Sequence, residues 1–340
     1  MAGTANPRQV VRELLERNKP SRPLFLPIVF SLGAQIENVP LRSYLANPTK
    51  IVSALRQIHA RVGADGVSCY FDPFLEAEAL GGTLEWETED GPPRLVWPGG
   101  VAESGLPRGI RSAEDAAKSG RVPVAAEVIR RMKEALRDSA LLMVGLRGPI
   151  ALSVEIVKGR EGGDRHPPAA AVELAGTALS EIARALLEAG ASAVVIREEV
   201  PSKFNSDRGE EGAEHLSALI NVARFYEALP VFLCRGGTNI GDTLMKLVRA
   251  ARGAKPCMAP PRASYDVHDS ELEAGPGTWS FALPPEAFSE DETSYASFEK
   301  GMQRLIAAGR PALMTTWDDV PQTTDTKRLA QVNGMLAARA

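Results

Sequence analysis

Short apolar runs alternate with longer amphipathic segments along most of the chain. The apolar runs are bounded by turn residues and are typical of buried strands, as in LFLPIVF and SAVVIREEV. The segments between them repeat apolar residues at three- and four-residue intervals, which predicts helices. The predicted strands span residues 24–30, 65–72, 139–149, 192–200, 229–237, 254–264, 277–285 and 311–319. The predicted helices span residues 47–64, 122–138, 169–191, 212–228, 241–253, 285–310 and 324–340.

This alternation favours an α/β fold with a parallel sheet, because right-handed crossovers place a helix between successive parallel strands. A succession of eight strands is the number in a (β/α)₈ TIM barrel, so we predict a single barrel domain over residues 1–340. A doubly wound sheet is the alternative, although no GxGxxG follows a predicted strand. Residues 1–22 predict an N-terminal helical extension, and the Gly- and Pro-rich segment 81–109 predicts a long βα-loop insertion.

Composition narrows the class of protein. The chain has 340 residues, 44% of them hydrophobic and 24% charged, so it can bury a sizeable core. Its net charge is −4 and it has no basic block, which argues against nucleic-acid binding. Three widely spaced cysteines fit reduced thiols, and no apolar run is long enough to span a membrane. We therefore expect a cytoplasmic enzyme with a small-molecule substrate, as a monomer or a homodimer.

The working groups of a barrel lie at the carboxyl ends of its strands and in the loops that follow. Carboxylates, arginines and aromatic residues recur at these positions, which predicts a pocket for a polar or acidic ligand with flat apolar parts. The candidate residues are Phe30, Gln35, Tyr70, Asp72, Glu78, Arg147, Arg197, Glu198, Glu199, Cys234, Arg235, His268, Trp317 and Asp318.

Each candidate also has a structural interpretation. An aspartate at a strand–helix junction, such as Asp72 or Asp318, is typical of a helix cap. Glu198 and Glu199 would form weak exposed ion pairs with Arg197. A buried cysteine is more often a small core side chain than a nucleophile, and a tryptophan at the last strand can plug the barrel. These alternatives remain open at the level of sequence.

Several segments, taken in order, resemble the uroporphyrinogen decarboxylase superfamily. They include RPLFLPIVFSLGA, GADGVSCYFDPFLEAEALGG and EIARALLEAGASAVVIREE, and the most specific feature is Asp72 followed by EALG at residues 78–81. The superfamily contains the decarboxylase and a branch of corrinoid-linked methyltransferases, which the N-terminal third resembles more closely. The resemblance implies that Asp72 matches the aspartate with which the decarboxylase binds pyrrole N–H groups and stabilises a cation.

Two features depart from the family pattern. The decarboxylase carries several arginines after its first strand, whereas the loop FSLGAQIENVPLR contains only Arg42. The thiol-methylating branch binds zinc through a His-x-Cys pair and a late cysteine. Here Phe232 replaces the histidine before Cys234, and TTWDDVP at residues 315–321 has no cysteine. We therefore expect no zinc, no other metal site and no tightly bound cofactor.

The resemblance implies one-carbon (methyl) group transfer without the zinc-thiolate mechanism, with a corrinoid protein or tetrahydrofolate as co-substrate. Asp72, Glu198 or Asp318 would supply or remove a proton, and the other candidates would bind substrate. A first alternative is decarboxylation of a pyrrole or aromatic acid whose carboxylate is held by Arg147, Arg197 or Arg235. A second alternative is a non-catalytic member of the family that binds a ligand.

Overall fold

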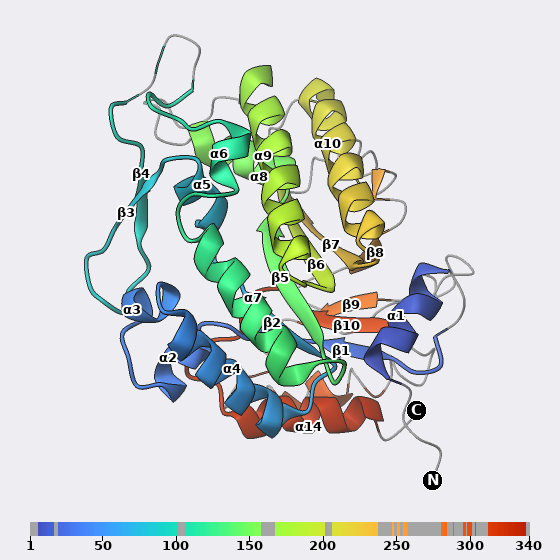
Figure 1. Ribbon diagram of the computed structural model, residues 1–340. Coiled ribbons are helices and arrows are strands. Elements are labelled where there is room, and N and C mark those ends of the chain that lie inside the picture. The colour runs from blue at the N-terminus through green and yellow to red at the C-terminus, as the bar shows by residue number, and fades with distance from the viewer. Residues whose placement is uncertain are drawn as a thin grey trace.

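The computed structural model describes residues 6–16, 20–100, 102, 106–157, 167–200, 206–236, 247, 250–251, 254–257, 280–283, 288, 295–296, 298–300, 303 and 312–337. Within these ranges, eight parallel strands form the centre of the molecule (Figure 1). They are β1 (Leu24–Leu26), β2 (Gly66–Tyr70), β5 (Leu141–Arg147), β6 (Ala193–Val200), β7 (Leu229–Gly236), β8 (Lys255–Cys257), β9 (Ser280–Leu283) and β10 (Leu313–Thr316).

The strands pair in two groups whose edge strands contact each other. One group has the order β2-β5-β6-β7-β8, and the other has the order β1-β10-β9. The Asp65 N–H donates to the Phe25 carbonyl at 3.0 Å and joins β2 to β1, while β8 contacts β9 on the other side. The first and last strands are neighbours, with Leu24 opposite Leu313. The predicted (β/α)₈ barrel is confirmed.

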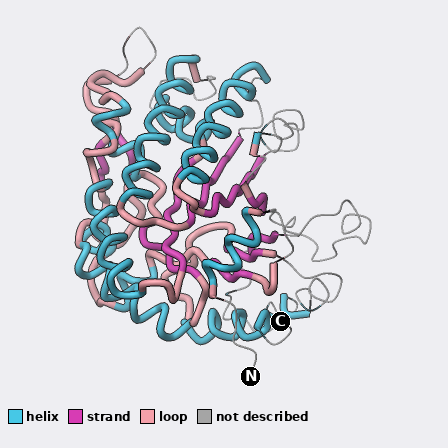
Figure 2. The backbone as a smooth tube through the Cα atoms, turned by 45° about the vertical axis from the view of Figure 1, so that its right-hand side comes forward, coloured by secondary structure: helices cyan, strands magenta, loops and turns pink. Residues whose placement is uncertain are grey.

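Helices surround the strands, as Figure 2 shows in cyan around magenta. They are α1 (Pro7–Leu15), α2 (Leu32–Ile36), α3 (Leu41–Leu45), α4 (Pro48–Val62), α5 (Leu75–Ala79), α6 (Ala113–Ala116), α7 (Val122–Leu136), α8 (Pro149–Val157), α9 (Ala169–Glu188), α10 (Ser206–Phe225) and α14 (Thr326–Ala337). Helix α1 forms the N-terminal extension. None of the helices described here is long and apolar enough to cross a membrane.

Helix α4 illustrates how local sequence sets the element boundaries. Asn47 caps its start, since the side-chain oxygen accepts from the backbone N–H groups of the second and third helical residues, and Pro48 occupies the first position. Gly63 ends the helix with φ of 65°, a left-handed conformation that glycine adopts without strain. Ile51 and Leu55 are fully buried, and each such side chain contributes about 1.5–3 kcal/mol.

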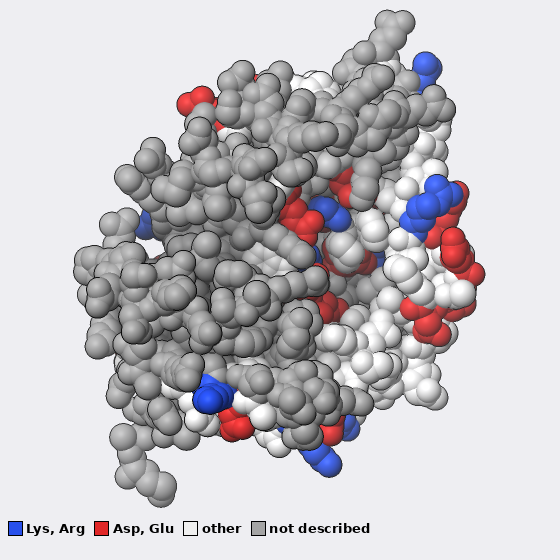
Figure 3. Space-filling view, turned by 180° about the vertical axis from the view of Figure 1, so that it is seen from behind, with Lys and Arg blue, Asp and Glu red and all other residues white. Residues whose placement is uncertain are grey.

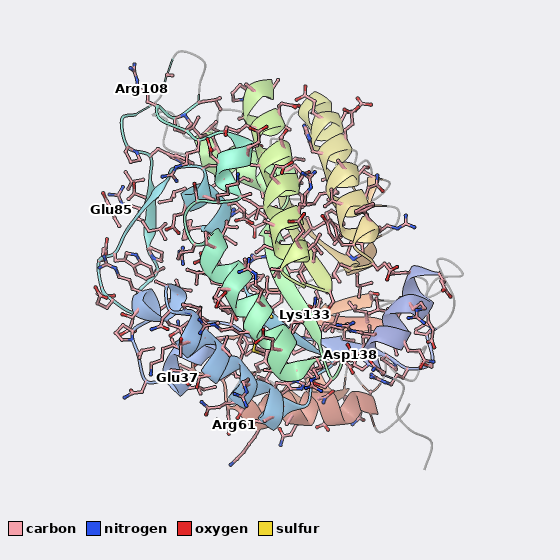
Figure 4. All side chains as sticks on the ribbon, viewed as in Figure 1. Glu37, Arg61, Glu85, Arg108, Lys133 and Asp138 are labelled. Carbon is pink, nitrogen blue, oxygen red and sulfur yellow. The ribbon has the colours of Figure 1, made fainter. Side chains whose placement is uncertain are left out.

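The strands are buried on both faces, which explains their continuous apolar sequence. In β5, every residue from Leu141 to Leu146 is buried, because side chains on one face fill the barrel and those on the other pack against the helices. Charged side chains on the outer faces of the helices point to solvent. Figure 4 shows this for Arg61, which projects away from the end of α4.

Several elements differ from the expectations, among them the short helices α2, α3, α5 and α6, which were not predicted. The segment 81–109 contains an antiparallel hairpin of β3 (Thr83–Glu85) and β4 (Arg94–Val96), whose short strands lack a long alternating pattern. Helix α8 was not predicted, because its uniformly apolar sequence PIALSVEIV carries no helical periodicity. Helix α10 begins at Ser206, earlier than expected. The predicted helices at 241–253 and 285–310 lie mostly outside the described residues.

Candidate functional site

A pocket opens where strands β2, β5 and β6 end. It measures about 40 Å³, and one water molecule needs about 10–15 Å³ by the same measure, so the pocket has room for a small chemical group. It is lined by Phe71, Asp72, Pro73, Gly145, Leu146, Arg147, Ala151, Arg197 and Glu199. Four of these residues, Asp72, Arg147, Arg197 and Glu199, are candidates from the sequence. Figure 3 views the molecule from behind and shows acidic and basic side chains together near the middle of that face.

Arg197 links the end of β6 to the end of β10. Its Nη1 lies 3.1 Å from Oδ1 of Asp318, and its Nη2 donates to Oδ2 at 3.3 Å. Nη2 is also 3.6 Å from a carboxylate oxygen of Glu199, and the guanidinium lies 5.0 Å from the centre of the Phe71 ring. The side chain is 17% exposed, and its Nε is buried without a hydrogen-bond partner among the described residues. Asp318 and Glu199 therefore hold Arg197 through its terminal nitrogens.

The second arginine of the pocket is fixed by backbone contacts. Nε of Arg147 donates to the carbonyl of Pro73 at 2.6 Å, and Nη2 lies 3.7 Å from the carboxylate of Glu155. The neighbouring Gly145 is needed for close packing, because a Cβ there would lie 2.1 Å from a carbon of the Phe71 ring. The Pro73 contact therefore ties Arg147 to the segment that follows β2.

Asp72 is buried at the pocket wall and is held from two directions. One oxygen accepts from the Phe74 N–H at 2.8 Å, a cap-like turn contact just before α5, whose own N-cap residue is Phe74. The other oxygen pairs with Nη1 of Arg121, and Nε of Arg121 donates to Glu78 at 2.5 Å. Nη2 of Arg121 is buried and has no partner in the described part of the chain. Asp72 is therefore more than a cap, and the predicted Glu78 contacts it through Arg121.

Glu76 is a buried carboxyl group beside this cluster. It is fully buried, its Oε1 accepts the backbone N–H of Arg147 at 2.7 Å, and its Oε2 is buried without a hydrogen-bond partner among the described residues. Burial in an apolar environment raises the pKa of Glu76 to about 7, against the opposing effect of the Arg147 N–H. The group therefore changes protonation close to neutral pH.

The structure places Glu198 at the start of helix α8. Its two carboxylate oxygens accept the N–H groups of Ala151 at 2.6 Å and Ile150 at 3.1 Å. Gly148 makes room for it, because a Cβ there would lie 2.2 Å from Oε2 of Glu198. Burial raises the pKa of Glu198 to about 8. Its contacts are those of a helix cap, and it does not line the pocket.

The end of the last strand lies beside the loop after the first strand, as the sequence predicts. The residue that makes this contact is Asp319, whose oxygens accept the N–H groups of Phe30 at 2.7 Å and Ser31 at 2.8 Å. Burial raises the pKa of Asp319 to about 6. Asp318 instead turns to Arg197, and Trp317 is buried with its backbone N–H bonded to Leu283.

Three further candidates, Phe30, Tyr70 and Gln35, do not line the pocket. Phe30 and Tyr70 are fully buried with their ring centres 4.9 Å apart, and the Tyr70 hydroxyl donates to the Leu45 carbonyl at 2.7 Å. Both therefore belong to the packed interior. Gln35 is exposed and borders a separate hollow. The side chains of Cys234 and Arg235 and the whole of His268 lie outside the described residues.

The sequence matches the family described as uroporphyrinogen decarboxylase (URO-D) over residues 6–247, which is more than half of the chain. The chain belongs to this family. A comparison with curated proteins finds no match.

Solved structures extend the comparison to the whole fold. A methyltransferase from Methanosarcina mazei is similar with a TM-score of 0.75 and 15% identity, over 99% of this chain and 98% of that one. A phosphonomutase described as putative, from Burkholderia cenocepacia J2315, is 14% identical over 98% of this chain and 97% of that one, with a TM-score of 0.42. At these identities the first comparison shows the fold alone, and the second carries no argument.

A metal ion would need several ligating side chains that converge on one point. Among the side chains that the structure describes, no group of three or more histidine, cysteine, aspartate or glutamate residues is arranged to hold a metal ion. Phe232, at the position where the family resemblance implies a histidine, is buried in the core. Because the Cys234 side chain lies outside the described residues, the expectation that the protein uses no zinc stays a prediction.

Sequence reasoning missed Arg121, Glu76 and Asp319. Glu76 lies four residues after Asp72 on the short helix α5. An acidic residue so close to a candidate at a strand end could have been added to the candidates from the sequence. Asp319 follows Asp318 directly, and the choice between two adjacent aspartates depends on backbone direction at the strand end. Arg121 precedes helix α7 at a distance of 49 residues from Asp72, and no local pattern connects the two.

Proposed function

We propose that the chain is an enzyme that transfers a methyl or related one-carbon group to a nitrogen or oxygen atom of a small molecule. Family membership and the fold shared with a methyltransferase support this proposal. The observation that carries it is Asp72, a carboxylate on the pocket wall that is held in place by Arg121. The donor would be a methylcorrinoid on a partner protein or a methyltetrahydrofolate.

The transfer requires one proton to move. A lone pair of the acceptor forms the new bond to the methyl carbon, and the donor keeps the electron pair of the bond that breaks. An acceptor N–H or O–H must then release its proton, and a carboxylate within hydrogen-bond reach accepts it. Of the three carboxylates predicted for catalysis, Asp72 alone lines the pocket, while Glu198 caps α8 and Asp318 is not among the lining residues. We assign the proton acceptor to Asp72.

The same geometry argues against uroporphyrinogen as the substrate. That molecule carries many carboxylates, each of which costs several kcal/mol to bury without a partner. Arg42, the arginine of the first loop, is 54% exposed and paired with Glu89 at 2.9 Å. The pocket also has room only for a small group. The acceptor is therefore expected to be a small molecule.

An isotope experiment tests the proposal. The purified protein is incubated with methylcobalamin or methyltetrahydrofolate bearing a labelled methyl group and with small acids that contain an N–H or O–H group. Molecules that copurify with the protein, identified by mass spectrometry, are added to the panel. We expect labelled product, and an Asp72→Asn variant should lose about 100-fold or more of the rate.

A matched control is available on the surface. Asp138 is 64% exposed and paired with Arg8 at 3.1 Å, so Asp138→Asn should keep the full rate. Equal rates in the Asp72→Asn and wild-type proteins would remove Asp72 from the mechanism. Absence of labelled product with every donor and every copurified molecule would reject methyl transfer.

Decarboxylation of a small pyrrole or aromatic acid is the second candidate. Two guanidinium groups, those of Arg147 and Arg197, line the pocket together with Asp72. An arginine would hold the substrate, and Asp72 would stabilise the cation formed when the ring is protonated. Release of CO₂ from a member of the same panel, without any methyl donor, would favour this reaction over methyl transfer.

A further inference from the structure

Two arginines stand side by side on the pocket wall. Arg147 and Arg197 are register partners in the parallel pair β5 and β6, and both line the pocket. Like charges on adjacent strands destabilise a sheet unless a negative group lies between or beside them. The Arg147 side chain is 20% exposed and the Arg197 side chain 17%, so water screens this repulsion only in part. This part of the pocket is therefore suited to an anion.

The carboxylates that now face Arg197 are weakly held. The side chains of Asp318 and Glu199 are 48% and 51% exposed, and exposed ion pairs of this kind contribute about 0–1 kcal/mol. Either carboxylate regains its hydration when it turns toward solvent. Arg197 cannot do the same, because it lies over the Phe71 ring with its Nε buried and without a partner in the described residues.

From this arrangement we infer that Arg197 binds the carboxylate of the small-molecule substrate, and that Asp318 occupies this position when the substrate is absent. Asp318 presents two oxygens to two guanidinium nitrogens, which is the geometry that an incoming planar carboxylate would reproduce. The displaced Asp318 side chain is 48% exposed and regains its hydration, so the exchange costs the protein little.

The other charged groups that face the pocket leave Arg197 available. Asp72 is engaged by Arg121, and Arg147 has Glu155 at 3.7 Å. The pocket volume of about 40 Å³ fits a carboxylate with the first atoms of its ring, while the rest of the ligand stays at the mouth. The inferred class is a small planar monocarboxylic acid. The inference that Arg197 binds a carboxylate depends on the proposed function in one respect, namely that this acid is also the acceptor of the methyl group.

Binding measurements test the inference without any turnover. Isothermal titration would compare benzoate and pyrrole-2-carboxylate with the neutral benzamide and pyrrole-2-carboxamide. We expect the acids to bind and the amides to bind at least about tenfold more weakly, because charge-assisted bidentate bonds are the stronger ones. Arg197→Lys should weaken acid binding about tenfold or more, since an ammonium cannot reproduce the planar fork.

The Asp318→Asn variant gives the more discriminating test, because it removes the carboxylate that competes with the ligand and leaves the pocket otherwise intact. It should tighten benzoate binding several-fold, whereas a merely structural ion pair would leave binding unchanged or weaken it. Thermal melting of each variant confirms folding, and Arg42→Met is the matched control for the loss of a surface arginine.

Several outcomes would overturn the inference. These are no acid binding by the wild-type protein, equal binding by Arg197→Lys, unchanged or weaker binding by Asp318→Asn, or tighter binding of inorganic phosphate than of the acids. Failure of the proposed function is recognised separately. If the acids bind as expected but accept no labelled methyl group, the carboxylate anchor stands and methyl transfer does not.

Discussion

Strand β2 carries an aspartate–arginine pair at each of its ends, and the two pairs use their polar atoms differently. At the amino end, Asp65 accepts both terminal nitrogens of Arg22, at 2.7 and 2.9 Å, and also the Phe25 N–H at 2.9 Å. At the carboxyl end, Asp72 accepts hydrogen bonds from the Phe74 backbone N–H and from Nη1 of Arg121. Nη2 of Arg121 is buried and has no partner among the described residues.

This difference suggests that the pair at the amino end of β2 serves stability and the pair at its carboxyl end serves function. The Asp65 pair closes the bottom of the barrel, where it joins β1 to β2. The Asp72 pair lies at the carboxyl end, where barrel enzymes place their chemistry, and its neighbours Arg197 and Glu76 also retain unused polar atoms. Buried polar groups without partners are costly. His59 and Ser280 also carry such an atom, but Arg121, Arg197 and Glu76 are charged residues around one pocket, which favours a role in binding.

The largest expected effect is on the amino-end pair. Asp65→Ala would leave Arg22, a side chain only 16% exposed, without its carboxylate. We expect a loss of about 3–5 kcal/mol in the free energy of unfolding, measured by urea denaturation. Acid binding by the protein that remains folded should be unchanged. A loss below about 1 kcal/mol, close to that of Asp138→Ala, would contradict the structural role of this pair.

At the carboxyl end of β2, the protonation of Glu76 should make the free energy of unfolding depend on pH. The pKa of Glu76 is about 7 in the folded protein and 4.5 as an ordinary value, so the folded state holds more protons than the unfolded state between these pH values. The contribution of Glu76 to the free energy of unfolding therefore falls as pH rises from 4.5 to 7, by up to about 3 kcal/mol, and this contribution is constant above that range.

The Glu76→Gln variant removes this titration and keeps an oxygen for the Arg147 N–H. Relative to the wild-type protein, the variant should gain stability as pH rises from 4.5 to 7. Urea denaturation at several pH values measures the difference. A difference that does not change with pH would show that Glu76 does not titrate in this range.

A substitution of Arg121 should affect both stability and turnover, whereas a substitution of Asp65 should affect stability alone. The Arg121 guanidinium contacts Asp72 and Glu78 through different nitrogens, and a lysine ammonium does not span both contacts. We expect Arg121→Lys to cost about 1.5–3 kcal/mol of stability, the range of a hydrogen bond to a charged group, and to lower turnover. Turnover equal to wild type at a temperature where the variant is folded would mean that Arg121 does not position Asp72.

The smallest effect is expected at Arg42. Its ion pair with Glu89 is exposed on both sides, so Arg42→Ala should change the free energy of unfolding by less than about 1 kcal/mol. Acid binding should also be unchanged, because the first loop is not expected to hold substrate carboxylates. A marked loss of acid binding, seen by titration calorimetry, would move the anion site from Arg197 to the first loop.

The fold and part of the site were readable from sequence. Apolar strands alternating with amphipathic helices predict the barrel, because both patterns arise from local periodicity. The same reasoning places Asp72, Arg147, Arg197 and Glu199 at strand ends, and in a parallel barrel all such ends meet at one rim. The sequence by itself thus determined which end of the molecule carries the pocket and four of the residues that line it.

Only the tertiary structure decided what each side chain does there. Arg197 and Glu198 are adjacent in sequence, but alternation along β6 sends one to the pocket and the other to the start of α8. Arg121 meets Glu78 and Asp72 across 43 and 49 residues of chain. The physical reason is that partner choice depends on distances and burial set by packing between elements, which the local periodicity of a sequence does not contain.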